Sequence, residues 1–258
     1  MNVRSEGFQM SDARLSRRTL LTATTALMGL VAAAASARTI QGLPWTGNEV
    51  YPPPEVRPGP WLFFTPDEAS AIEAIVDRLI PQDELGPGGK EAGCAVFIDR
   101  QLAGPYGRAE GVYMQGPFPE RPLPTQGFQS PLTPAQAYRK GLAGLAAHVS
   151  RNFGGRGIPQ LSGEELDRLL TSLEKREVNT PEFNGSEIFD LIFNNTMEGF
   201  FADPIYGGNR DMAGWKLIGF PGTRYDFRDV LERPNTRYTL PPVSLIGRPD
   251  WNRAGGRG

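Results

Sequence analysis

The chain has 258 residues and a formal net charge of −2, and its 39% hydrophobic and 22% charged residues are enough for a folded core in one or two domains. The near-neutral charge gives no bulk electrostatic reason to expect nucleic-acid binding. Because Cys94 and His148 are the only cysteine and histidine, the chain cannot form an internal disulfide, a four-thiolate iron–sulfur cluster, a Cys/His zinc site or a covalent haem attachment.

Residues 1–37 have the features of an export signal. Arg17 and Arg18 precede a mostly apolar run over residues 20–35, and Ala35-Ser36-Ala37 matches a cleavage signature. This run is shorter than the roughly 20 residues that span a bilayer. Paired arginines before a mild apolar run are typical of the twin-arginine route. We therefore predict a twin-arginine signal peptide over residues 1–37, in preference to an uncleaved anchor or an amphipathic N-terminus.

The twin-arginine route carries proteins that have already folded, often with a cofactor or a partner in place. The chain shows no cofactor motif of its own, so assembly with a partner is the natural reason for this route. Nothing later in the sequence is apolar over a length that would span a membrane. We therefore expect membrane association only through partners.

An extended arm follows over residues 38–60. It contains Tyr51-Pro52-Pro53-Pro54 and Arg57-Pro58-Gly59-Pro60. Proline fixes φ and lacks a backbone donor, so these residues do not continue a helix or a central strand. We predict that residues 61–258 form a single mainly helical domain with an irregular C-terminal tail.

Two helices are expected in the first part of this domain. Thr65-Pro66-Asp67-Glu68 is a capping box with proline at the first helical position, and the apolar residues after it recur at helical spacing until Pro81. A shorter helix is predicted over residues 91–102, with Ala95, Ile98 and Leu102 on one side.

Three further helices are expected along the chain. One begins at the capping box Thr133-Pro134-Ala135-Gln136 and ends at Gly154-Gly155, and the next starts at Ser162 with a leucine stripe. The last begins near residues 184–187 and breaks at Asp203-Pro204. No strand pattern of similar quality is present. The predicted fold class is mainly α, with about five helices in one compact domain, long ordered loops rich in Gly, Pro and aromatic residues, and extended terminal arms.

Two stretches are too irregular for a plain helical bundle. Residues 103–131 carry many glycines and prolines together with Tyr106, Tyr113, Phe118 and Phe128. The stretch after Pro204 carries Tyr206, Trp215, Phe220, Tyr225, Phe227, Tyr238 and Trp251. Aromatic residues on an irregular backbone fit a surface that wraps another protein. The alternative is that both stretches fold back on their own helices.

Isolated reactive residues give little indication of catalysis. His148 stands alone among alanines and Val149, which favours a packed or half-exposed histidine. The segment 86–91 resembles a phosphate loop but lacks Ser or Thr after Lys90, so we interpret it as a turn-rich linker. Cys94 is either a small buried hydrophobe or, as the odd cysteine of an exported chain, a candidate for an inter-subunit disulfide.

The densest group of polar residues lies within residues 198–216. Arg210 among the carboxylates opposes a cation site, and the spacing matches no calcium loop. We expect a rigid loop that forms a partner interface, through Asp203, Tyr206, Asn209, Arg210, Asp211 and Trp215. No catalytic, cofactor-binding or metal-binding residue is predicted. Two alternatives stay open: a stand-alone acid–base enzyme that uses Glu198 with Asp203 or Asp211, and a sugar-binding module with aromatic platforms.

Several segments resemble the small (gamma, third) subunit of bacterial membrane-bound gluconate 2-dehydrogenase and its relatives. The likeness runs from about Phe63 to about Asp229, and the segments that carry it are residues 63–68, 78–81, 84–88, 97–107, 131–134, 198–216 and 219–222. Residues 198–216 form the longest and most specific of them.

The resemblance implies a non-catalytic small subunit that supports the assembly and twin-arginine export of a flavoprotein. It implies two partners, an FAD-containing large dehydrogenase subunit and a multihaem cytochrome c subunit, and a periplasmic location at the outer face of the bacterial inner membrane. FAD and haem c are expected in those partners and no cofactor in this chain. The family supplies no catalytic residue to carry over, and the large subunit determines which sugar or sugar acid is oxidised.

Overall fold

The computed structural model describes residues 55–119, 123–127, 129–180, 183–223, 228–231 and 233–246. The predicted signal peptide and residues 38–54 of the predicted arm lie outside the described residues, as do Phe128, Tyr225, Phe227 and Trp251.

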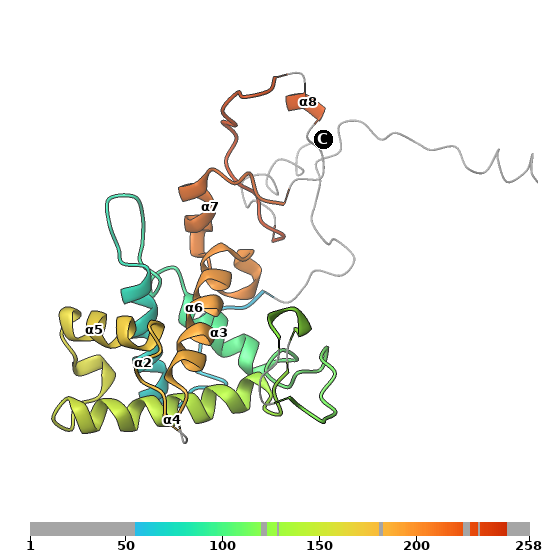
Figure 1. Ribbon diagram of the computed structural model, residues 1–258. Coiled ribbons are helices and arrows are strands. Elements are labelled where there is room, and N and C mark those ends of the chain that lie inside the picture. The colour runs from blue at the N-terminus through green and yellow to red at the C-terminus, as the bar shows by residue number, and fades with distance from the viewer. Residues whose placement is uncertain are drawn as a thin grey trace, which may run out of the picture. The chain divides into compact units, whose positions relative to one another are not determined.

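The described chain is helical (Figure 1), which confirms the predicted fold class. The α-helices are α2 (Pro66–Leu79), α3 (Cys94–Ala103), α4 (Pro134–Asn152), α5 (Gly163–Glu174), α6 (Gly185–Phe201), α7 (Ala213–Ile218) and α8 (Arg228–Leu231). The described residues between them also form the 3-10 turns η1 (Pro124–Gln126), η2 (Ile158–Gln160), η3 (Pro204–Tyr206) and η4 (Arg210–Met212). Within the described ranges no β-strand forms, although isolated bridges such as Gly222 with Val243 occur.

The five predicted helices correspond to α2 through α6, and local capping explains where most of them begin. Thr65 Oγ1 accepts a hydrogen bond from the backbone nitrogen of Glu68 at 3.3 Å, and the Glu68 carboxylate accepts one from the backbone nitrogen of Thr65 at 2.8 Å. The same reciprocal pair forms at the starts of α4 and α5. Such an N-cap contributes about 1 kcal/mol.

The second helix begins later than predicted. Its first residue is Cys94 rather than Glu91, because Gly93 has a φ of +84° and breaks the helical path before it. The short helices α7 and α8 were not predicted, and α7 follows two non-glycine residues in the left-handed region, Asp211 and Met212, which local sequence patterns do not indicate.

Helix α6 lies at the centre of the core and packs against α2, α3, α4 and α5. Its residues Ile188, Ile192 and Phe200 are buried against apolar side chains of the other helices. Full burial of each such side chain contributes about 1.5–3 kcal/mol. The buried side chains from the surrounding helices include Ile72, Ile75, Val76, Ile98, Leu102, Tyr138, Leu145, Val149, Leu169 and Leu173.

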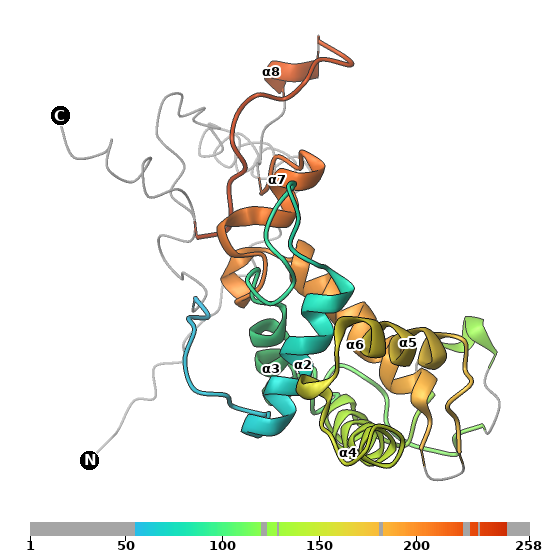
Figure 2. The same cartoon turned by 90° about the vertical axis from the view of Figure 1, so that its left-hand side faces the viewer.

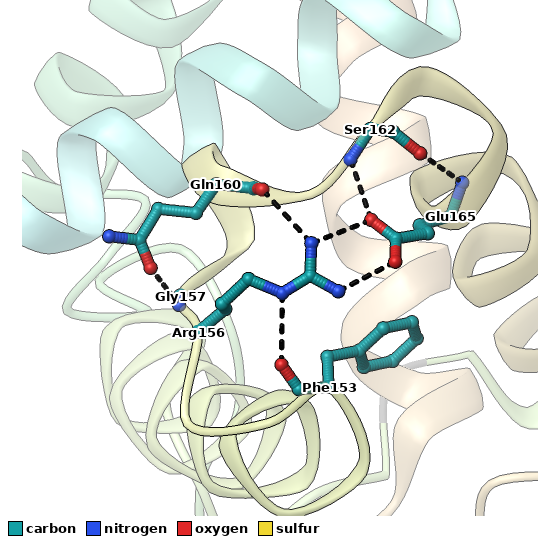
Figure 3. Close-up of polar contacts among 6 residues, drawn as sticks. All are labelled: Phe153, Arg156, Gly157, Gln160, Ser162 and Glu165. Atoms are coloured by element: carbon teal, nitrogen blue, oxygen red, sulfur yellow. Dashed lines mark hydrogen bonds and ion pairs between the residues drawn. The ribbon is translucent and has the colours of Figure 1, made fainter.

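The connection from α4 to α5 is held by one ion pair. The Arg156 guanidinium donates to both oxygens of Glu165, at 2.9 and 2.6 Å, and its Nε donates to the carbonyl of Phe153 at 3.0 Å (Figure 3). Glu165 also accepts from the backbone nitrogen of Ser162 at 2.8 Å. These contacts hold the pKa of Glu165 far below its usual range, at about 2, with the Arg156 hydrogen bond as the largest cause.

Among the residues that the structure describes, no helix combines the length and the apolar character needed to cross a membrane.

Candidate partner-binding site

After α6 the chain turns back on itself through η3 and η4 before it enters α7. This polar turn, residues 202–212, contains five of the six residues that the sequence predicts as a partner interface, and the sixth, Trp215, lies in α7. The turn is held by contacts with the end of α6, with the residues that precede α3 and with Leu245.

Asp203 ties this turn to a distant part of the chain. Its Oδ1 accepts from the backbone nitrogen of Ile205 at 3.0 Å, and its Oδ2 accepts from that of Leu245 at 2.7 Å. The side chain is buried, and this burial raises the pKa of Asp203 above its ordinary value while the two backbone hydrogen bonds oppose the rise. Both carboxylate oxygens are therefore occupied in holding backbone.

Asn209 closes the turn from within. It is fully buried in the left-handed region, with a φ of +46°. Its Nδ2 donates to the carbonyl of Ala202 at 2.7 Å, and its Oδ1 accepts from the backbone nitrogen of Gly214 at 2.9 Å. The side-chain amide thereby links the end of α6 to the start of α7, and asparagine tolerates this backbone conformation better than most residues do.

Arg210 connects the turn to the residues before α3. Its backbone nitrogen donates to the carbonyl of Ala92 at 3.0 Å, and its guanidinium lies 3.5 Å from the carbonyl oxygen of Glu91. A Cβ added to Gly93 would lie 2.6 Å from the carbonyl oxygen of Gly207 and 2.9 Å from Nε of Arg210. Glycine at position 93 therefore permits this close approach.

Trp215 packs into its own chain. It is only 4% exposed, and its Nε1 donates to the carbonyl of Phe201 at 2.7 Å. Its ring meets that of Phe220 edge to face, with 5.2 Å between the centroids. Trp215 thus positions α7 against the end of α6.

The six predicted interface residues therefore divide into two groups. Asp203, Asn209 and Trp215 are buried and give the turn its shape, while Tyr206 and Asp211 are exposed and Arg210 is half-exposed. In this structure only the second group offers surface to another protein.

Of the three alternative acid–base residues, Glu198 and Asp203 are engaged within the chain, whereas Asp211 is exposed. Glu198 accepts a hydrogen bond from Nδ2 of Asn195 at 2.8 Å. Asn195 Oδ1 accepts one from the hydroxyl of the buried Tyr138 at 2.8 Å and lies 3.4 Å from that of Tyr106. The predicted aromatic loop is thus partly self-packed through Tyr106, which is still 37% exposed, whereas Tyr113 is 76% exposed.

The comparisons with known proteins identify the family. The family model described as gluconate 2-dehydrogenase subunit 3 matches residues 66–222, well over half of the chain. The chain belongs to this family. The matched range begins at the first residue of α2 and ends at Gly222, four residues after the end of α7. The polar turn of this subunit 3 protein therefore lies inside it. No curated protein and no solved structure matches the chain.

Cys94 is fully buried at the first position of α3, and its burial raises the pKa of the thiol to about 12. A bond to another subunit needs an accessible sulfur, which this packing does not offer. The structure therefore favours the packed hydrophobe over the inter-subunit disulfide for this subunit 3 protein.

His148 is half-buried, as the sequence predicted. It lies beside Asn152 on α4, and its ring centroid is 6.4 Å from that of Phe183. Among the described residues, no group of three His, Cys, Asp or Glu side chains is arranged to hold a metal ion.

Sequence reasoning missed Asp99. This carboxylate is fully buried and accepts backbone hydrogen bonds from Leu62, Phe63 and Phe64, each at 2.9 Å, and it forms an ion pair with Arg100. A signal was available in the sequence, since Asp99 lies on the apolar side of α3 that also carries Ala95 and Leu102. An acid on such a side indicates a buried structural carboxylate.

Proposed function

We propose that the protein is a non-catalytic small subunit of a periplasmic, FAD-dependent sugar or sugar-acid dehydrogenase complex similar to gluconate 2-dehydrogenase. In this role it supports the assembly of the FAD-containing large subunit and its export by the twin-arginine route, and a multihaem cytochrome c subunit completes the complex. The observation that carries the proposal is the match to the subunit 3 family over residues 66–222.

The arrangement of the polar turn supports an assembly role over a stand-alone acid–base role. A general acid or base needs a carboxyl group that can exchange a proton with a substrate. Both oxygens of Asp203 hold backbone amides, and Glu198 bonds to an asparagine. Two of the three candidate carboxylates are therefore used to position backbone and side chains of the chain itself, and the third, Asp211, is exposed.

The proposed export role is supported by the sequence alone. Arg17 and Arg18 precede the apolar run, and no cofactor motif follows them. A partner that lacks its own signal would then cross the membrane together with this chain.

The test replaces Arg17 and Arg18 together by lysine and measures acceptor-dependent sugar dehydrogenase activity in periplasmic and cytoplasmic fractions. We expect the double variant to retain both this chain and the flavoprotein in the cytoplasm. Arg14→Lys is the matched control, because it changes a nearby arginine outside the pair and is expected to export normally. Normal periplasmic activity in the double variant would contradict the export role.

A further inference from the structure

A shallow depression lies where the turn between α2 and α3 meets α7. It is lined by residues 82–87, Glu91, Arg210, Asp211, Ala213 and Lys216. Figure 2 shows the turn rising beside α7. Two chain segments that are at least 119 residues apart in sequence thus form one surface, which contains two of the predicted interface residues, Arg210 and Asp211.

The turn presents Leu85 to solvent in a fixed position. Asp83 Oδ1 accepts from the backbone nitrogens of Leu85 and Gly86, at 2.8 and 3.3 Å, and the backbone nitrogen of Asp83 donates to the carbonyl of Gly86 at 3.2 Å. Leu85 is nevertheless 74% exposed. A hydrophobic side chain on an ordered turn suits binding, because little backbone conformational entropy is lost when it is covered.

Exposed apolar residues lie close in sequence to the lining residue Lys216. Leu217, Ile218 and Phe220 lie within four positions of it and are 46%, 60% and 43% exposed. The buried Trp215 holds Phe220 in place, since its ring contacts that of Phe220 and its carbonyl accepts from the backbone nitrogen of Phe220 at 2.9 Å. Clustered apolar residues held outward in this way are typical of protein–protein contact surfaces.

The charges at the depression indicate what kind of segment would cover it. Its lining holds four carboxylates, Asp83, Glu84, Glu91 and Asp211, against two cationic side chains, Arg210 and Lys216, an excess of two negative charges. The Arg210 guanidinium is directed toward a backbone carbonyl, that of Glu91. A complementary partner segment therefore combines apolar side chains with Lys or Arg.

We propose that this surface, formed by residues 82–87 and Arg210–Phe220, is where the flavoprotein subunit docks, and that it accepts an apolar segment flanked by Lys or Arg. The inference rests on the proposed function and adds the location and the partner chemistry. It also reassigns the predicted interface: the exposed Leu85 and Ile218 make the contact, while Asp203, Asn209 and Trp215 hold the surface in shape.

The test uses the full tagged chain produced with its complex and isolated natively. It measures the ratio of flavin to tagged chain over a series of dilutions. The double variant Leu85→Ser with Ile218→Ser removes apolar contact without adding charge, and Glu84→Lys reverses one lining charge. Leu123→Ser is the matched control, because Leu123 is similarly exposed, at 63%, and lies outside this surface. Thermal melting checks that each variant is folded.

We expect the double variant and Glu84→Lys each to lower the flavin ratio at least tenfold at the dilution where half of the wild-type complex survives, while Leu123→Ser behaves as wild type. An unchanged ratio in the double variant overturns the location, and loss only in Leu123→Ser places the docking surface elsewhere. An unchanged ratio in Glu84→Lys overturns the cationic partner segment. If the wild-type chain carries no flavoprotein, the proposed function itself is refuted. If the wild-type chain instead self-associates and the double variant does not, the surface binds a second copy of the chain and not the flavoprotein.

Discussion

Asp99 Oδ1 lies 2.9 Å from the backbone nitrogen of Phe64, although the two residues are 35 positions apart. The same carboxylate holds Leu62 and Phe63, so it joins the segment before α2 to the middle of α3. One buried carboxylate therefore helps to fix the position of α2 relative to α3.

Asp99→Asn is expected to lower the free energy of unfolding by about 2–4 kcal/mol, since hydrogen bonds to a charged group contribute roughly 1.5–3 kcal/mol and the amide offers only one acceptor oxygen. Urea unfolding of the full chain measures the change. Asp190→Asn is the control, because Asp190 is exposed on α6 and its substitution should stay within about 0.5 kcal/mol. A loss below about 1 kcal/mol for Asp99→Asn would mean that the carboxylate is dispensable.

Trp215 and Tyr206 are expected to behave differently on replacement by alanine. Trp215→Ala should lower the stability of the chain by about 3–5 kcal/mol, because it empties a buried site and leaves the Phe201 carbonyl without its donor. Tyr206→Ala should change stability by no more than about 0.5 kcal/mol, since its side chain is 46% exposed. Thermal melting distinguishes the two, and a Trp215→Ala chain that melts like wild type would contradict the assigned packing.

Cys94 is expected to resist alkylation at pH 8 in the native chain and to react after unfolding. Burial raises the pKa of its thiol to about 12, so almost no thiolate is present at that pH. Mass spectrometry after a timed exposure to iodoacetamide measures the reaction. Non-reducing electrophoresis of the native complex checks the alternative, because a larger band that disappears on reduction would demonstrate the inter-subunit disulfide.

The pair formed by Arg156 and Glu165 predicts a pH dependence at the acid end. A carboxyl group whose pKa is depressed on folding stabilises the protein above its unfolded pKa, near 4.5, and this contribution is lost as pH falls toward about 2. In Arg156→Gln the pKa of Glu165 should rise toward 4.5, and this part of the acid sensitivity should disappear. An NMR titration of the Glu165 carboxyl carbon measures both proteins.

Arg151→Gln serves as the control for this titration, since Arg151 is an exposed neighbour on α4 and forms no ion pair with Glu165. In the Arg151→Gln variant, Glu165 should titrate as in the wild type. If Arg156→Gln leaves the pKa of Glu165 unchanged, the ion pair is not what lowers it.

The parts of the fold that depend on neighbouring residues could be predicted from the sequence. Thr65 and Thr133 begin their helices through contacts only three residues away, and the predicted starts are therefore correct. Contacts between distant residues were missed. The backbone nitrogen of Leu245, which donates a hydrogen bond to Asp203, lies 42 residues away in sequence. No local pattern indicates such a pair.

The difference between local and long-range contacts also explains how much of the candidate site could be predicted. The sequence identified the polar turn because unusual residues are concentrated there, but composition does not reveal which of them face inward. Trp215 and Asn209 were predicted to contact a partner and are buried in their own chain. Leu85 was not singled out for an interface, because exposure of a leucine depends on the tertiary position of its turn.

Native purification of the tagged full chain, with a visible absorption spectrum and mass spectrometry of whatever accompanies it, tests whether the chain is a non-catalytic subunit of a flavoprotein complex. We expect a flavoprotein with sugar or sugar-acid dehydrogenase activity and a cytochrome c subunit to co-purify and the preparation to show flavin and haem absorption. The chain separated from them should be colourless and inactive. A chain that purifies alone and turns over a sugar substrate with an artificial electron acceptor would contradict it.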